Sequence, residues 1–156
     1  MQAHVWAFIF VVTTAAFLVG CSFLLKNPKI SVKNVTPVSF SLTELDLSVT
    51  LDVYNPNSLG ITLKTLSFDI YYQNGAEWVY LCHGEQAGIK ISPGENEVTI
   101  PITIRNIALA SSLLNLIRTG EITFQVRGVA SPDFFGIAPK VPFTRTVTRS
   151  LKDIGA

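Results

Sequence analysis

Histidine and cysteine are scarce in this sequence, and their scarcity excludes most catalytic chemistry. The 156 residues include 2 histidines and 2 cysteines. His4 lies in an apolar N-terminal stretch, so His83 is the only histidine in the rest of the chain. Its neighbour Cys82 has no further ligands at metal-ligand spacing, and no Ser-His-Asp order or glycine-rich phosphate loop appears. We therefore expect no enzyme, no metal site and no cofactor.

An excess of charge of either sign is also missing. Lys and Arg number 12 against 11 for Asp and Glu, which leaves a net charge of +1. This balance gives no electrostatic footprint for nucleic acid. The length allows one domain plus an N-terminal segment, and a domain of this size folds without a metal or disulfide. Cys82 is expected to be an unpaired thiol that serves as a small core hydrophobe.

The clearest strand pattern runs from Leu45 to Val53. Apolar residues alternate there with Asp, Ser and Thr, which is the period-two pattern of a strand with one buried face. The alternation resumes at Ile61 and slips by one residue at Lys64. Since a slip would turn the later side chains to the wrong face, we predict a β-bulge near Lys64.

Other segments predict a small all-β domain with one helix. Asn74-Gly75 predicts a hairpin with a type I′ turn, in which both residues have positive φ. Gly84–Gly88 is predicted to be a loop. Asn106 and Gly120 frame an expected amphipathic helix, Ile107–Arg118. Further strands are expected as follows: an edge strand at Ile30–Val35, a strand at 98–104, and strands at 122–127 and 141–151. Because of Pro101, the strand at 98–104 is expected either at a sheet edge or with the position of the missing amide facing solvent. The predicted fold is an antiparallel β-sandwich of about seven strands, immunoglobulin- or fibronectin-III-like.

The corner Asn55-Pro56-Asn57 follows the central strand. Pro56 fixes its own φ and favours an extended Asn55, and either Asn side chain can cap nearby amides. On these grounds the motif is interpreted as a connection between two strands.

This arrangement resembles the type 2 late embryogenesis abundant (LEA) family, whose domain is also called WHy, for water stress and hypersensitive response. The resemblance rests on a long alternating strand, Asn55-Pro56-Asn57, a second strand, a hairpin, and a strand with Thr99-Ile100-Pro101-Ile102. It implies a small β-sandwich with one helix, no enzymatic activity and an association with stress tolerance. It implies no catalytic residues.

The N-terminal stretch from Val5 to Leu25 carries no charge. Within it, Leu18-Val19-Gly20-Cys21 resembles a bacterial-type lipobox, which implies cleavage before Cys21 and lipidation of its thiol. The chain is then divided into a signal peptide (1–20), a tether (21–29) and a β-sandwich domain (30–151). The protein is expected at the cell envelope, on the periplasmic or extracellular face.

A single-pass transmembrane anchor is the alternative for this stretch. Residues 1–6 contain no Lys or Arg, whereas Lys26, Lys29 and Lys33 follow the apolar run. By the positive-inside rule an uncleaved helix with these flanks leaves the domain in the cytoplasm.

Two adjacent aromatic residues, Phe134 and Phe135, lie in a turn-rich segment and are expected either to cap the core or to project as an apolar tip. We expect a monomer that meets the membrane through its lipidated N-terminus; the sequence does not identify a protein or lipid partner. The leading function is stress protection, against desiccation for example, or accessory binding at the envelope. The alternative is a carrier of an apolar small molecule or lipid, which requires an interior lined by small residues rather than the Leu, Val, Ile and Phe found at inward positions.

Overall fold

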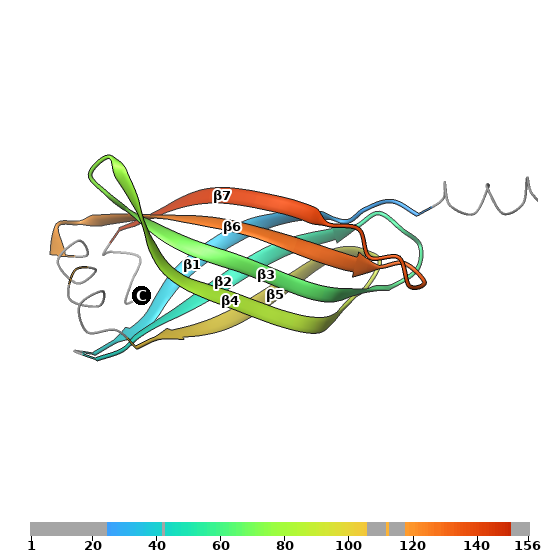
Figure 1. Cartoon of the computed structure of the whole chain (residues 1–156), viewed down its shortest axis with the longest axis horizontal. Helices are drawn as coiled ribbons and strands as arrows, with labels where there is room; N and C mark the ends of the chain where they lie inside the picture. The colour runs from blue at the N-terminus through green and yellow to red at the C-terminus, as the bar shows by residue number, and fades with distance from the viewer. Residues whose placement is uncertain (1–24, 42, 106–111, 113–117, 151–156) are drawn as a thin grey trace, which may run out of the picture.

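The computed structural model describes residues 25–41, 43–105, 112 and 118–150, and these residues form seven β-strands (Figure 1). The strands are β1 (Lys29–Phe40), β2 (Leu45–Asn55), β3 (Ile61–Asn74), β4 (Glu77–Ile91), β5 (Gly94–Ile104), β6 (Glu121–Asp133) and β7 (Val141–Ser150).

The strands form two antiparallel sheets packed face to face. One sheet has the order β1-β2-β5, and the other has the order β4-β3-β6-β7. Along one side of the sandwich β1 lies beside β7, and along the other β4 lies beside β5 (Figure 1). The predicted seven-stranded immunoglobulin-like sandwich is confirmed.

The alternating strand β2 occupies the centre of its sheet, as its pattern predicts. Leu47, Val49, Leu51 and Val53 are almost completely buried, and the residues between them are less so. Its two neighbours are edge strands: β1, which contains the predicted Ile30–Val35, and β5, where Pro101 is exposed. A proline is tolerated there because the missing amide faces no further strand.

The predicted bulge at Lys64 is confirmed. Leu63 pairs with Pro132 and Thr65 with Ser131, so Lys64 is the extra residue in β3 opposite β6. Because the bulge absorbs the slip, Leu63 and Leu66 both face the core although they are three residues apart.

The predicted loop Gly84–Gly88 is wrong, because these residues continue β4 without a break. Gly84 pairs directly with Phe68 of β3, and a Cβ atom at Gly84 would lie 2.6 Å from Cζ of the Phe68 ring. On the other side of Phe68 lies Gly128 of β6. A Cβ atom at Gly128 would likewise clash with an aromatic ring, that of Phe143 in β7. Gly84 therefore makes room for a core ring rather than marking a turn.

The hairpin between β3 and β4 is confirmed, but its turn is shifted by one residue. Asn74 pairs with Glu77, so the two turn residues are Gly75 and Ala76. Of these two residues only Gly75 has a positive φ, at 62°. This is a feature of a type II′ turn rather than the predicted I′. The predicted helix Ile107–Arg118 lies mostly outside the described residues.

Candidate functional site

The corner Asn55-Pro56-Asn57 is built around two buried amide side chains. Asn55 is 1% exposed and Asn57 is 7% exposed. The Asn55 Oδ1 atom accepts hydrogen bonds from the Asn57 backbone amide at 3.0 Å and from Asn57 Nδ2 at 2.9 Å. Asn55 Nδ2 donates to the Leu59 carbonyl at 2.9 Å. The first asparagine therefore closes the turn, as expected for residues that favour turns by bonding nearby backbone.

The second asparagine reaches a segment that is distant in sequence. Asn57 Oδ1 accepts a hydrogen bond from the Lys26 amide at 2.8 Å, and Asn57 Nδ2 donates to the Lys26 carbonyl at 2.7 Å. A carboxamide has the donor and acceptor of a peptide group, so Asn57 pairs with Lys26 as a neighbouring strand would. We call this pair of bonds the latch. The sequence analysis missed it because 31 residues separate the partners and no local pattern links them.

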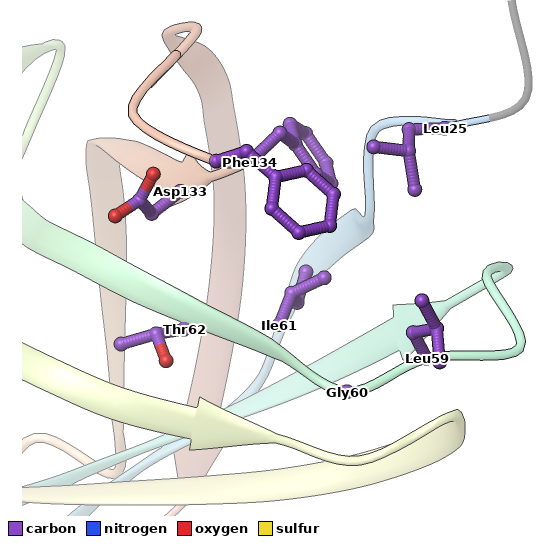
Figure 2. Close-up of a pocket in the computed structure, with 8 residues that line it drawn as sticks. Leu25, Leu59, Gly60, Ile61, Thr62, Asp133 and Phe134 are labelled. Carbon is purple, nitrogen blue, oxygen red and sulfur yellow. The ribbon is translucent and has the colours of Figure 1, made fainter. Parts of the chain in front are cut away.

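The latch lies at the end of the sandwich where the chain enters the domain, which we call the tether end (Figure 1). The β2–β3 corner, the β4–β5 turn and the β6–β7 loop meet there. Leu25 of the entering chain, Leu59 and Ile61 after the β2–β3 corner, and Phe134 of the β6–β7 loop line a pocket of about 180 Å³ (Figure 2).

Phe134 and Phe135 differ in burial. One caps the core and the other projects into solvent, so each of the two expected positions is occupied by one residue. Phe134 packs against the core, whereas Phe135 is 88% exposed. Two backbone hydrogen bonds between Phe134 and Ile137, of 2.8 and 3.1 Å, hold the loop, and Asp133 Oδ1 accepts a bond from the Gly136 amide at 2.8 Å. Phe135 itself has a φ of 54°, a conformation uncommon for a large side chain.

Ile137, at 72%, and Leu59, at 60%, are also exposed at the tether end. We call Leu59, Phe135 and Ile137 the apolar tip. Four exposed lysines lie in the chain segments of this end, where the carboxylates are Glu95 and Asp133; these lysines are Lys26, Lys29, Lys90 and Lys140. None of them forms an ion pair with another described residue.

Comparison with known proteins assigns the family. The family model described as late embryogenesis abundant protein (LEA_2) matches residues 50–147, well over half of the chain. The uncharacterized protein MJ1138 of Methanocaldococcus jannaschii is 35% identical over 126 residues, which cover 80% of this chain and 71% of MJ1138.

The chain belongs to the LEA family.

Two solved structures share the fold of this LEA domain. The solution structure of a candidate late embryogenesis abundant (LEA) protein has 17% identity and a TM-score of 0.62, and the alignment covers 96% of this chain and 85% of that one. A protein from Arabidopsis thaliana has 13% identity and a TM-score of 0.59, with coverage of 81% and 83%. At these identities the likeness shows the fold alone.

The outer face of the four-stranded sheet carries a further polar cluster of this LEA sandwich. His83 Nδ1 lies 2.8 Å from Asp69 Oδ1, and its Nε2 lies 4.0 Å from Glu85. The Arg127 guanidinium stacks 4.8 Å above the Tyr71 ring. Within the described part of the chain no group of three or more His, Cys, Asp or Glu residues is arranged to hold a metal ion.

Cys82 is half-buried on β4 and packs against the core. Burial, with a smaller contribution from the Asp69 charge, raises the pKa of its thiol to about 12. A thiol in this state is un-ionised at neutral pH and therefore unreactive.

The predicted anchor residues, Leu18, Val19, Gly20 and Cys21, lie outside the described residues. No helix within the described ranges is long and apolar enough to cross a membrane.

Proposed function

We propose that this LEA protein is a non-enzymatic domain anchored to a membrane by its N-terminus, where it protects or supports envelope components under water stress. The observation that carries the proposal is the latch. It fixes Lys26, only five residues after Cys21, against the body of the sandwich. An anchor at Cys21 would therefore hold the tether end close to the lipid surface.

The alternative function, a carrier of an apolar molecule, has less support. The inward faces of both sheets meet in one continuous cluster of Leu, Val, Ile and Phe side chains. The pocket at the tether end, about 180 Å³, is smaller than the 300 to 1,000 Å³ common for sites that enclose a small molecule. A filled core and a small surface pocket favour a role carried by the surface and the anchor.

Intact-mass measurement of protein extracted from membranes tests the anchor. We expect loss of residues 1–20 and addition of lipid to Cys21. A Cys21→Ser variant that remains in the membrane at full length would instead support the transmembrane alternative. Native mass spectrometry of the same sample tests the carrier, because a stoichiometric bound lipid that survives detergent removal would favour it.

The protective activity is tested by drying a labile reporter enzyme with the purified chain. We expect more recovered activity than with an equal mass of serum albumin, which controls for nonspecific surface coating. Equal recovery with the two proteins would contradict the protective function and leave accessory binding as the role of the domain.

A further inference from the structure

The exposure of the apolar tip is not explained by anchoring at Cys21 alone. Scattered apolar residues on a surface are normal, but Leu59, Phe135 and Ile137 come from two loops that meet at one end of the sandwich. Large side chains that protrude from neighbouring loops form a compact apolar point, which suits insertion rather than a flat contact.

The β6–β7 loop is built to keep Phe135 outside. The bonds between Phe134 and Ile137 and from Gly136 to Asp133 fix the backbone while Phe134 points inward. Phe135 is thereby held at a positive φ with its ring in solvent. A strained conformation that exposes an aromatic ring needs a reason beyond the packing of the domain.

The surroundings of the apolar tip indicate what covers it. Leu25 lines the pocket beside Leu59 and is the last residue of the uncharged run that starts at Val5. The four lysines of the tether end, which we call the basic rim, have no carboxylate partners among the described residues. Apolar side chains beside a basic rim are complementary to a bilayer surface with anionic headgroups.

We propose that the apolar tip inserts into the interface of an anionic membrane while the basic rim contacts the lipid headgroups. The sandwich then contacts the bilayer at two places, through the N-terminal anchor and through the tip. Its long axis points away from the bilayer, so the opposite end, where β1 joins β2, is the far end from the lipid. The inference rests on the proposed anchoring and adds an orientation to it.

A second copy of the chain is a less suitable occupant. Two tips brought together would place the basic rims of both copies against each other, and like charges in such contact oppose association. A lipid surface supplies both the apolar layer and the negative charge.

Tryptophan quenching in vesicles tests the inference on the full-length chain. Phe135→Trp places the probe at the apolar tip, and Val38→Trp is the matched control, because Val38 is 65% exposed but lies near the far end of β1. Each variant is bound to vesicles of phosphatidylcholine and phosphatidylglycerol that contain lipids brominated on the acyl chain. The signal of the unmodified chain, which already contains Trp6 and Trp78, is subtracted.

We expect quenching at position 135 to exceed that at position 38 by about twofold or more, as for a side chain inserted below the headgroups. Quenching at position 135 should decrease when phosphatidylglycerol is replaced by phosphatidylcholine. Equal quenching at the two positions would overturn the inference. Emission shifted to the blue at position 135 without quenching by bromine would also overturn it, because a second copy would then cover the tip.

Failure of the inference and failure of the proposed function give different results. Vesicle sedimentation reports anchoring independently of quenching. If the unmodified chain sediments with vesicles and position 135 is not quenched, the anchor stands and the inserted tip is wrong. If the chain does not sediment at all, the anchoring is wrong and the inference is overturned with it.

Discussion

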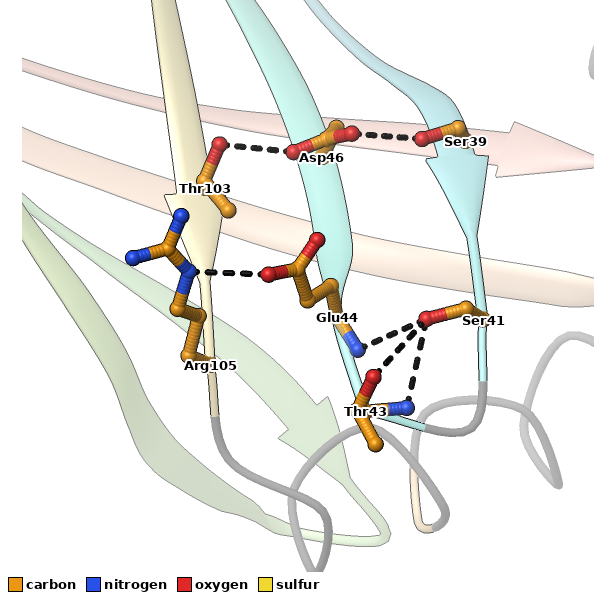
Figure 3. A network of polar contacts seen from close by, with 7 residues as sticks. All are labelled: Ser39, Ser41, Thr43, Glu44, Asp46, Thr103 and Arg105. Carbon is orange, nitrogen blue, oxygen red and sulfur yellow. Dashed lines mark hydrogen bonds and ion pairs between the residues drawn. The ribbon is translucent and has the colours of Figure 1, made fainter.

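The two ends of the sandwich are held together by different means. At the far end, where β1 joins β2 and β5 ends, exposed polar side chains link the three strands (Figure 3). At the tether end, the two buried asparagines make the links, and large apolar side chains remain in solvent.

The far-end network is centred on Asp46 of β2. Its carboxylate accepts hydrogen bonds from Ser39 of β1 at 2.5 Å and from Thr103 of β5 at 2.7 Å. Arg105 pairs with Glu44 at 2.8 Å. These groups are exposed, so water competes for each bond and each contributes little to stability.

Burial therefore decides how much each polar link contributes to stability. A bond between buried groups leaves unsatisfied donors and acceptors when it is broken, whereas broken exposed bonds are replaced by water. The latch is therefore the stronger link, and it joins the N-terminal segment to the domain. The far end is closed by polar groups that suit a surface facing water.

The largest effect is expected for Asn57→Ala. The substitution removes both part-buried bonds to Lys26 and one buried bond to Asn55, so we expect the free energy of unfolding to fall by about 2 kcal/mol. Urea denaturation measures this change. Asn74→Ala, at the exposed far-end hairpin, is the matched control and should change stability by less than about 0.5 kcal/mol. Equal effects of the two substitutions would remove the contrast between the ends.

Asp46→Asn is expected to lower the free energy of unfolding by less than Asn57→Ala does. The change should be visible mainly in how stability depends on pH. Hydrogen bonds from Ser39 and then Thr103 hold the pKa of Asp46 below its ordinary value of 3.8. A carboxylate with a lowered pKa stabilises the fold above that ordinary value, and the contribution is lost as the pH falls through the folded-state pKa. Stability of the two proteins should therefore differ at neutral pH and converge in acid. A difference that stays constant across this range would show that Asp46 contributes through packing alone.

Loss of the latch is expected to leave the reactivity of the Cys82 thiol unchanged. Since its thiol is un-ionised with a pKa of about 12, iodoacetamide at pH 8 should not modify it in the folded protein, and denaturant should expose it. In Asn57→Ala the protection should persist under native conditions, because Cys82 pairs with Ile70 in the body of the sheet rather than at the tether end. Rapid alkylation in that variant would mean that the latch supports the whole sandwich and not one end of it.

Local patterns predicted the strands well and the long-range contacts poorly. The alternation in β2 and the slip at Lys64 are properties of neighbouring residues, so both were readable from the sequence. Gly84 was misread because its role depends on the Phe68 ring in another strand. From the sequence, Phe135 could either cap the core or project into solvent. Only the backbone conformation of the loop decides between the two. The partner of Asn57 could not be predicted, because an amide side chain bonds any backbone segment that the fold brings near.

Hydrogen exchange of the Lys26 amide, measured by NMR on the full-length chain in detergent micelles, tests the central claim most directly. The account predicts that this amide, bonded to Asn57 Oδ1, exchanges far more slowly than the Glu44 amide at the far end, which donates to the exposed Ser41 hydroxyl at 3.0 Å. Protection of Lys26 should disappear in Asn57→Ala and remain in Asn74→Ala. Exchange of the Lys26 amide at the rate of a free peptide in the unmodified protein would contradict the latch, and with it the proposed placement of the tether end at the membrane.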